Sequence, residues 1–454
     1  MVEIAYLASH ILPGDKNARN KARPNIGVCK TEDSKVTDTR ANAMPAITRS
    51  VGAFKLADLG WLLVFNLLMF QAPIQNATGF TYIDESATLI AIAAYTIERL
   101  RSSGNNDKAG ILASRCLLCL GLVVAVGLLS NLFSGVSAAA SSIAIDMFTC
   151  IKFPVALICI TLVFRNKTQL LRAVEGECKA LVAVLLFFGV LNLFVQIGDF
   201  GVDPRYGIRS FRFIFIHPEM LNFVCVGILL ILAQDYRKNM KWIIATLFII
   251  CLSLRSKGIA FAAIALLLML TWGRGGRLNL AQIAVGAVAA FAIGWDQYKY
   301  YFKSTGFARS ELNRVAVVLA NRFFPLGSGF ATYGSSITSG LSNYSPLYYE
   351  YGLSTVYGLE PGQTAFLSDT FWPIVIGQFG WLGFVMYCLT IGFLCRWAYN
   401  FASSKGQRLA VVLCFVFLLI SSTAESAFFH PNAIFLAMCL GLALAGGHSS
   451  PEAA

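Results

Sequence analysis

Basic side chains that could hold a phosphate group gather in separate polar segments of this chain of 454 residues. A guanidinium group offers paired donors that match a phosphate group, so clustered arginines predict an anionic ligand that carries phosphate. The alternative is that these are solvated charges, each paired with a nearby carboxylate. The basic residues are Arg205, Arg209 and Arg212, then Arg255 and Lys257, and then Lys299, Lys303, Arg309, Arg314 and Arg322. The carboxylates that could pair with them are Asp199, Asp203, Asp296, Glu311 and Glu350.

Asp369 lies at the end of a long polar segment, where the next apolar stretch begins. At such a boundary the pKa of a carboxyl group can rise, which suits a general base that takes a proton from a hydroxyl group. The same residue could instead cap the N-terminus of the helix that follows. Polar residues in or beside apolar stretches are costly in lipid, so they either function, for example as proton relays, or form paired structural contacts. These residues are Asp146, Lys152, Glu219, Glu425 and His430.

Glycine, small hydroxyl and aromatic residues are concentrated in the segment 323–336. This composition suits a close approach of the backbone to a ligand and stacking against sugar rings, so Gly327, Gly329 and Tyr333 are candidate binding residues. The segment is not a phosphate-binding P-loop, because the Gly-Lys-Ser/Thr ending is missing. A run of tyrosines follows, which could bind sugars or anchor the chain at a membrane interface. These are Tyr344, Tyr348, Tyr349, Tyr351 and Tyr357.

The elements that position these residues are predicted to be membrane-spanning helices. Hydrophobic residues make up 57% of the chain and charged residues 13%, with a mean hydropathy of +0.65, which is too much apolar surface for one soluble core. The apolar runs are longer than the short alternating strands of a barrel, so the fold class is all-α. In a soluble protein the net charge of +12 would suggest a nucleic acid partner. Here the basic residues are sorted by the side of the membrane on which each connection lies, so we expect no nucleic acid partner.

We predict a polytopic membrane protein with about twelve transmembrane helices and one large extracytoplasmic loop. The seventh and eighth spans are short for a bilayer about 30 Å thick and could form a re-entrant pair, which would leave ten spans. The divisions are a basic, disordered cytoplasmic tail (1–54), spans one to nine (55–294), the large loop (295–367), spans ten to twelve (368–446) and a cytoplasmic tail (447–454). The apolar stretches are 55–72, 80–98, 110–132, 143–164, 180–198, 213–234, 241–254, 258–272, 278–294, 370–395, 409–423 and 428–446.

The charges of the connections set the orientation of these spans. Every second connection is basic, as expected on the cytoplasmic side, whereas the early outward connections 73–79 and 133–142 hold no Lys or Arg. Both termini are therefore predicted to lie in the cytoplasm. The basic segments around Arg205, Arg255 and Arg309 fall on the outer side against this trend, which favours the phosphate-binding interpretation. The inward basic residues are Arg99, Arg101, Lys108, Arg165, Lys167, Arg172, Lys179, Arg237, Lys238, Lys241, Arg274, Arg277, Arg396, Lys405 and Arg408.

The cysteines give no sign of disulfides or of a metal site. All twelve lie in apolar stretches or on the predicted cytoplasmic side, so no disulfide is expected in the outer part of the protein. Cys116 and Cys119 are spaced like half of a zinc site, but no second pair accompanies them. We predict no metal and no cofactor.

Three segments around the large loop resemble the Wzy-type polysaccharide polymerases and the related O-antigen ligases. The layout is similar over residues 55–446: basic residues precede His217-Pro218, and Ser256-Lys257-Gly258 stands where that superfamily has a Ser-Arg step. The resemblance implies a location in the bacterial cytoplasmic membrane. The segments are Asn321-Arg322-Phe323-Phe324-Pro325-Leu326-Gly327-Ser328-Gly329-Phe330, Phe366-Leu367-Ser368-Asp369-Thr370-Phe371-Trp372-Pro373 and Gly377-Gln378-Phe379-Gly380-Trp381-Leu382-Gly383.

Two departures from the family pattern bear on function. The ligase branch has histidine and asparagine at the entry to the span after the loop, where this chain has Asp369 and Thr370, which favours a polymerase over a ligase. Lys257 replaces the arginine of the Ser-Arg step, so the charge is kept but the paired donors are lost.

The resemblance implies transfer of a glycan chain from polyprenyl pyrophosphate to a second lipid-linked repeat unit at the outer face of the membrane. Positive charge must stabilise the departing pyrophosphate, and a base must accept the proton of the attacking hydroxyl group, without a metal ion. A chain-length regulator, a flippase and membrane lipid are the partners that the resemblance implies. The expected catalytic residues are Asp369, Arg209 and Arg309. The expected substrate-binding residues are Arg205, Arg212, Lys257, Arg314, Arg322, Gly327, Gly329 and Tyr333.

A second class of function is a secondary transporter or a flippase for lipid-linked oligosaccharides, with no covalent chemistry. Such folds usually contain internal repeats with broken helices in corresponding positions. The sequence contains no such repeat, and its single long loop is placed asymmetrically. A non-catalytic assembly protein is a further alternative.

Overall fold

The computed structural model describes residues 56–101, 108–205, 207–272 and 306–445. Within these ranges the chain is a helical membrane protein, because four helices are long and apolar enough to cross a bilayer. A fifth span results if α2 (Leu56–Met69) and α3 (Gln71–Thr78), which are bent by 73° at Phe70, form one broken span. The four long helices are α5 (Lys108–Phe133), α6 (Ala140–Val163), α7 (Thr168–Phe194) and α14 (Trp372–Phe401).

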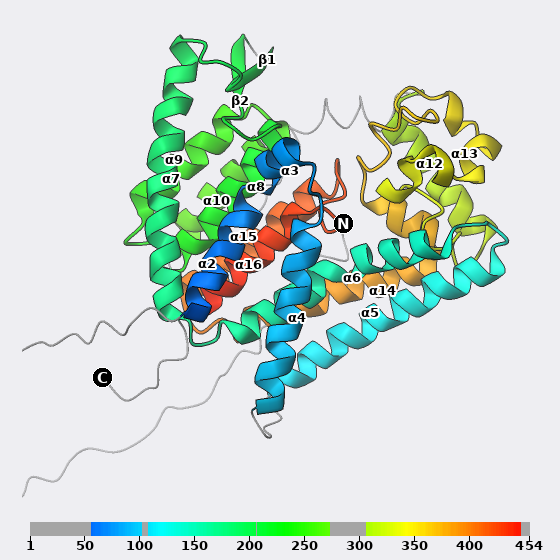
Figure 1. Cartoon of the computed structure of the whole chain (residues 1–454), viewed down its shortest axis with the longest axis horizontal. Helices are drawn as coiled ribbons and strands as arrows, with labels where there is room; N and C mark the ends of the chain where they lie inside the picture. The colour runs from blue at the N-terminus through cyan, green and yellow to red at the C-terminus, as the bar shows by residue number, and fades with distance from the viewer. Residues whose placement is uncertain (1–55, 102–107, 206, 273–305, 446–454) are drawn as a thin grey trace, which may run out of the picture. The chain divides into compact units, whose positions relative to one another are not determined.

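Every predicted apolar stretch coincides with a helix except the ninth, 278–294, which lies outside the described residues. The shorter helices follow the same order along the chain (Figure 1). They are α4 (Ile83–Arg101), α8 (Pro218–Ala233), α9 (Met240–Leu252), α10 (Ser256–Trp272), α15 (Lys405–Ser421) and α16 (Asn432–Leu444).

Helices α7 and α8 begin farthest from the starts of the apolar stretches that predict them, and local contacts explain why. Helix α7 begins at Thr168 rather than near residue 180, because its polar first turns are held by a Glu175–Lys179 ion pair of 2.6 Å. Helix α8 begins at Pro218 rather than at residue 213. His217 is extended and accepts a hydrogen bond from the Glu219 amide, and a proline at the first helical position fixes the start.

A β-hairpin interrupts the all-α fold between α7 and α8. Strand β1 (Gly201–Arg205) pairs antiparallel with β2 (Ile208–Phe211), and Gly207 at the turn has a φ of 77°, a conformation that glycine adopts without strain. The Ser210 hydroxyl donates to the carbonyl of Ser253, so the hairpin is fastened to the connection between α9 and α10.

The helix ends form two groups. In one group, Gln407 at the start of α15 donates to the Ala443 carbonyl at the end of α16 (3.1 Å), and Trp272 at the end of α10 donates to the Lys405 carbonyl (3.0 Å). In the other group, Trp372 at the start of α14 donates to Ser422 after α15 (3.1 Å). The hairpin contact with Ser253 belongs to this second group. Helices α14, α15 and α16 therefore run in alternating directions.

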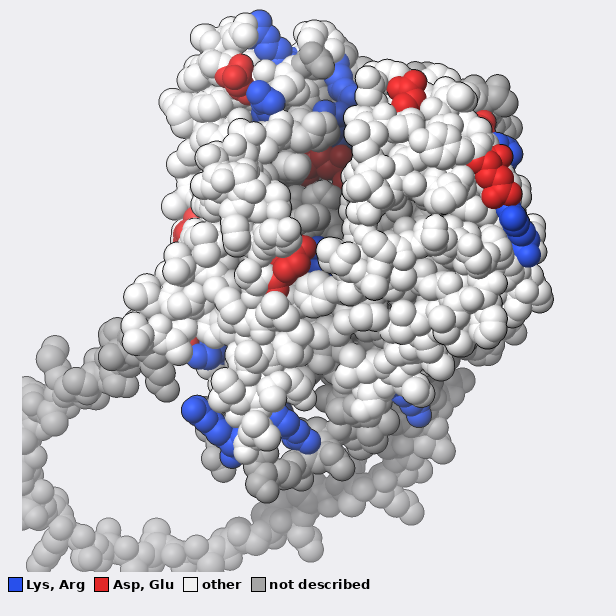
Figure 2. Space-filling view, turned by 45° about the vertical axis from the view of Figure 1, so that its right-hand side comes forward, with Lys and Arg blue, Asp and Glu red and all other residues white. Residues whose placement is uncertain are grey.

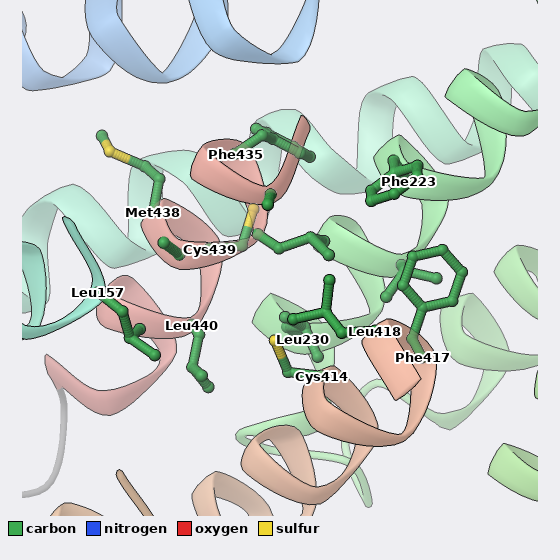
Figure 3. Close-up of a cluster of buried hydrophobic side chains, with 14 of the residues drawn as sticks. Leu157, Phe223, Leu230, Cys414, Phe417, Leu418, Phe435, Met438, Cys439 and Leu440 are labelled. Atoms are coloured by element: carbon green, nitrogen blue, oxygen red, sulfur yellow. The ribbon is translucent and has the colours of Figure 1, made fainter. Parts of the chain in front are cut away.

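Helices α8 and α16 form the centre of the helical core. Almost every residue of both is buried, and Gly227 of α8 lets Phe435 of α16 approach so closely that a Cβ would meet its ring at 2.3 Å. Figure 3 shows Phe223, Leu230 and Phe417 packed in the same region. Large apolar side chains on α5 and α7 are exposed instead, as expected for helices that face lipid.

The predicted polar loop has a folded structure of its own, which we call the loop segment (residues 306–371). Its main helix, α12 (Ala308–Arg322), buries Leu312, Val315 and Leu319 on one face, with the spacing of an amphipathic helix. The short elements that follow are α13 (Pro346–Glu350) and the 3₁₀ turns η2 (Ser336–Ser339), η3 (Leu341–Asn343) and η4 (Leu353–Thr355).

Asp146 of α6 fastens the loop segment to the helical core. Its carboxylate accepts hydrogen bonds from the Ala331 amide (2.7 Å), the Ser335 hydroxyl (2.6 Å) and the Gln378 side chain (2.8 Å). Helix α14 breaks at Gly380, whose φ of 63° brings its backbone against the Leu326 carbonyl. The loop segment is thus held by α6 and by the break in α14.

Candidate functional site

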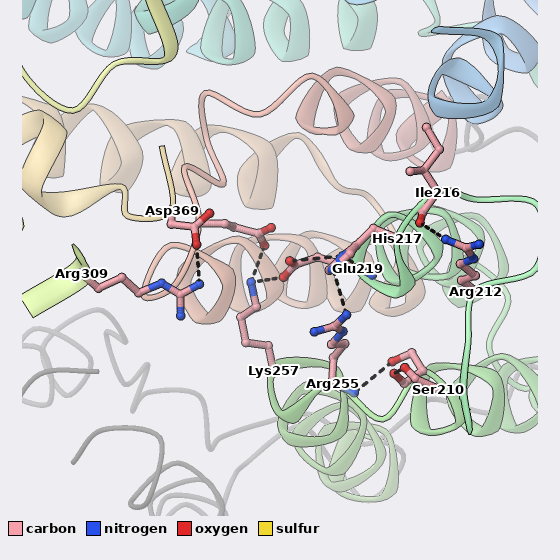
Figure 4. A network of polar contacts seen from close by, with 11 residues as sticks. Ser210, Arg212, Ile216, His217, Glu219, Arg255, Lys257, Arg309 and Asp369 are labelled. Carbon is pink, nitrogen blue, oxygen red and sulfur yellow. Dashed lines mark hydrogen bonds and ion pairs between the residues drawn. The ribbon is translucent and has the colours of Figure 1, made fainter. Parts of the chain in front are cut away.

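Charged side chains from five parts of the chain meet where the second group of helix ends lies (Figure 4). They come from the start of α8, the start of α10, the start of α12, the turn before α14 and the connection between α15 and α16. We call them the charged cluster. Its members are His217, Glu219, Arg255, Lys257, Arg309, Asp369 and Glu425.

Local backbone features bring the members from α8 and α10 together. His217 caps α8, which places Glu219 in the first turn of that helix. Leu254, with a φ of 51°, reverses the chain between α9 and α10 and places Arg255 beside His217, with 2.8 Å between Arg255 Nη2 and His217 Nε2. Lys257 follows in the first turn of α10.

Lys257 joins two carboxylates. Its ammonium group contacts Glu219 Oε1 and lies 3.1 Å from Glu425 Oε1. The side chains of Lys257 and Glu425 are only 19% and 10% exposed. Burial raises the pKa of the Glu425 carboxyl group to about 8, although Lys257 opposes the shift. The protonated form of Glu425 is therefore favoured relative to that of an ordinary carboxyl group.

Arg309 and Asp369 form the second ion pair of the charged cluster. Arg309 Nη2 donates to Asp369 Oδ2 at 2.8 Å, and the side chains are 17% and 29% exposed. Burial raises the pKa of the Asp369 carboxyl group, and Arg309 counteracts the rise. The prediction that Asp369 caps the following helix is wrong, because α14 has Phe371 at its N-cap and no side-chain cap bond.

The two ion pairs and His217 share one electrostatic environment. Glu219 and Lys257 both act on the pKa of Asp369, so the pairs lie near each other. Burial lowers the pKa of His217, with a further contribution from Arg255, which favours the neutral imidazole. The His217 side chain is 45% exposed. Figure 2 shows a hollow on one face of the molecule with acidic side chains in its depth and basic ones at its rim.

The three arginines of the hairpin region lie outside the charged cluster. Arg205, at the end of β1, is exposed and close enough to lower the pKa of His217. Arg209 is exposed on β2. Arg212 donates to the carbonyls of Asp199 (2.7 Å) and Ile216 (2.8 Å) and so fixes the turn that leads into α8.

Two arginines of the loop segment, expected as substrate-binding residues, have the carboxylate partners that the alternative interpretation names for them. Arg314 is 56% exposed and pairs at 2.8 Å with Glu311, one turn away on α12. Arg322 is 44% exposed, pairs with Glu350 and donates to the Tyr351 hydroxyl at 2.7 Å. Neither contacts the charged cluster.

The glycine-rich segment approaches other parts of the protein closely. A Cβ on Gly327 would lie 2.4 Å from the Gln378 carbonyl, and Gly329, with a φ of +102°, packs against Asn131. Tyr333 is fully buried and donates to the Leu312 carbonyl at 2.6 Å. The pattern predicted close backbone approach correctly, but the partners are α5, α12 and α14.

The other three polar residues inside apolar stretches form contacts with protein groups outside the charged cluster. Asp146 holds the loop segment, and Lys152 of α6 pairs with Asp84 and Glu85 of α4. His430 stacks on Phe223 with 5.0 Å between ring centroids.

Four members of the charged cluster are not among the expected catalytic or substrate-binding residues, although the sequence contains a signal for each. The signal for His217 and Glu219 is the His-Pro-Glu start of an apolar stretch, and Arg255 stands two residues before Lys257. Glu425 is an acidic residue in a short polar connection between two apolar stretches. Only the fold brings these positions together.

Among the described residues, no group of three or more His, Cys, Asp or Glu side chains could hold a metal ion. A scan of the chain against protein-family models and a search of curated proteins both found no match. The case for a function therefore depends on the charged cluster itself.

Proposed function

We propose that this protein is a polysaccharide polymerase that transfers a glycan chain from polyprenyl pyrophosphate to a lipid-linked repeat unit. The observation that carries the proposal is the convergence of Arg255, Lys257 and Arg309 with the carboxylates of Asp369 and Glu219 at one group of helix ends. Cations beside a carboxylate are what a reaction with a pyrophosphate leaving group and a hydroxyl nucleophile requires.

The cations would stabilise the leaving group. As the bond between the anomeric carbon and the phosphate oxygen breaks, the oxygen keeps the electron pair and its negative charge grows. Arg255 and Arg309 offer paired donors to such an oxygen, and Lys257 adds a point charge. Arg205, exposed at the tip of the hairpin, adds to the positive potential near His217.

Asp369 is the proposed general base. The hydroxyl group of the acceptor sugar attacks the anomeric carbon, and its proton passes to the Asp369 carboxylate. Two features support this role: Arg309 fixes the orientation of the carboxylate at 2.8 Å, and burial raises its pKa, which makes it a better proton acceptor.

The proposed topology has twelve spans, with both termini in the cytoplasm of a bacterial cell and the charged cluster at the outer face of the cytoplasmic membrane. The two groups of helix ends support the alternation. The group without the charged cluster carries Arg237, Lys238, Lys405 and Arg408, and the cytoplasmic side of a membrane favours basic residues.

Labelling of single cysteines tests this orientation, in a background without reactive native cysteines. Leu341→Cys, at a position that is 75% exposed in the loop segment, should react with an impermeant maleimide from outside intact cells. Lys238→Cys should react only after the cells are opened. Reaction of the Leu341→Cys protein only from inside would reverse the topology and remove the proposed site from the outer face.

The activity is tested with purified protein and purified lipid-linked repeat units. The proposal expects products of two or more joined units together with released polyprenyl pyrophosphate. Transfer of the glycan to a different lipid acceptor would instead indicate a ligase. Movement of the substrate across a vesicle membrane with no new glycosidic bond would indicate a flippase or transporter.

A further inference from the structure

The charged cluster contains as many carboxylates as cations, which is unusual for a site that must bind a dianion. Arg255, Lys257 and Arg309 face Glu219, Asp369 and Glu425. If all six were ionised, their charges would cancel. A pyrophosphate diester carries two negative charges, and carboxylates near it would repel it.

The geometry at Lys257 shows how this repulsion can be removed. One ammonium group contacts two carboxylates, Glu219 and Glu425, so it can neutralise only one of them. Two like charges in a poorly hydrated place favour a shared proton. Glu425 is the more buried of the two, with 10% of its side chain exposed against 23% for Glu219, and it is the less costly one to protonate.

We propose that the Glu219–Glu425 pair holds one proton when the pyrophosphate group binds, and that Glu425 is thereby a positioning residue that makes the site selective for its anionic ligand. This inference rests on the proposed function, because it takes the pyrophosphate-linked glycan as the ligand. With the proton in place, the cluster has a net charge of +1. Lys257 then needs to balance only Glu219.

The neighbours of Glu425 determine the sign of the pH effect. Lys257 and Glu219 are the groups that act on it directly. His217, Asp369 and His430 each interact electrostatically with Glu219 and Lys257 in turn. Burial raises the pKa of Glu425 to about 8, so the protonated form dominates at neutral pH and is lost as the pH rises through that value. Affinity for the anion should fall over the same interval.

The experiment measures binding of a farnesyl pyrophosphoryl sugar to the full-length protein in detergent, between about pH 6.5 and 9.5. This pyrophosphate diester keeps its charge over that range, so any pH dependence belongs to the protein. For the wild type, the dissociation constant should rise by up to about tenfold per pH unit above the pKa of Glu425. Binding below that pKa should change little.

Glu425→Gln mimics the protonated form and should bind with the same affinity at every pH in the range. Glu219→Gln provides a second test, because it removes the negative charge beside Glu425. The pH at which affinity is lost should then shift away from about 8. Glu360→Gln, a carboxylate change in the loop segment, is the matched control and should keep the wild-type profile. Size-exclusion chromatography checks that each variant is folded.

Parallel loss of affinity in wild type and Glu425→Gln would overturn the inference, as would a flat profile in the wild type. Synthesis of polymer by the wild type is measured separately with lipid-linked repeat units. Polymer made without proton-linked binding refutes only the role of Glu425. Absence of polymer from a protein with proton-linked binding refutes the polymerase and leaves a proton-linked anion site.

Discussion

Arg309 and Arg314 lie on the same helix, α12, yet the two sides of that helix give them opposite surroundings. Arg309 is 17% exposed, and its partner Asp369 comes from the turn before α14, 60 residues away. Arg314 is 56% exposed, and its partner Glu311 is three residues away on the same helix. An arginine whose carboxylate comes from a distant element is held in place by the whole fold, whereas a local surface pair contributes little.

The same contrast separates the charged cluster from the rest of the loop segment. The side-chain hydrogen bonds of Arg322 and Tyr333 remain inside that segment and help to fold it. The contacts of Lys257 join α8, α10 and the connection before α16. Residue type therefore does not distinguish a binding arginine from a structural one. The two kinds of arginine differ in how buried their carboxylate partner is and in whether that partner comes from a distant element of the fold.

The largest expected difference is between Arg309→Ala and Arg314→Ala. Loss of Arg309 removes a donor to the departing pyrophosphate and the group that orients Asp369, so polymer synthesis should fall by about 10² to 10³-fold, as for other preorganised donors. Arg314→Ala removes an exposed pair and should leave the rate within about twofold. The measurement is polymer formed from purified repeat units per folded enzyme.

Arg309→Lys refines this comparison. A lysine keeps the charge but not the paired donors, so little activity should return. Equal losses of polymer synthesis in Arg309→Ala and Arg314→Ala would mean that the burial of an arginine and the position of its partner do not predict its role in this protein.

A smaller difference is expected between Asp369→Asn and Glu350→Gln. The asparagine keeps the size of the side chain but cannot take a proton, so turnover should fall about a hundredfold, a usual loss for a positioned base. Glu350 pairs with Arg322 on the exposed side of the loop segment, and its change should leave turnover nearly normal. Near-normal turnover in Asp369→Asn would exclude Asp369 as the base.

The positions of the helices could be predicted from the sequence, because a long apolar run has few alternatives to a buried or lipid-facing helix. The starts of α7 and α8 could not, since an ion pair at Glu175 and a cap at His217 set them. The hairpin was missed because its strands are short and lie in a polar segment. The helical spacing of Leu312, Val315 and Leu319 was a signal for α12 that the sequence contained.

The candidate site was predictable only in part. Arg309, Lys257 and Asp369 stood out as charges beside apolar stretches, and the structure brings them near each other. Arg209 has the same sequence context but lies on an exposed strand. Glu425 stood out as a polar residue beside an apolar stretch, but only the fold places it beside Lys257. Pairing between distant elements is a property of the packed helices, and no local pattern encodes it.

The smallest expected effect concerns Tyr333, which separates binding from folding within the glycine-rich segment. Its hydroxyl group is buried and donates to the Leu312 carbonyl at 2.6 Å, so Tyr333→Phe removes this hydrogen bond between the glycine-rich segment and α12. The free energy of unfolding should fall by about 1 to 2 kcal/mol, measured by denaturation in mixed detergent micelles. Turnover per folded molecule should not change. Tyr357→Phe is the matched control, because Tyr357 is 74% exposed and its change should leave stability unaltered. A fall in turnover of Tyr333→Phe at unchanged stability would return Tyr333 to the binding site.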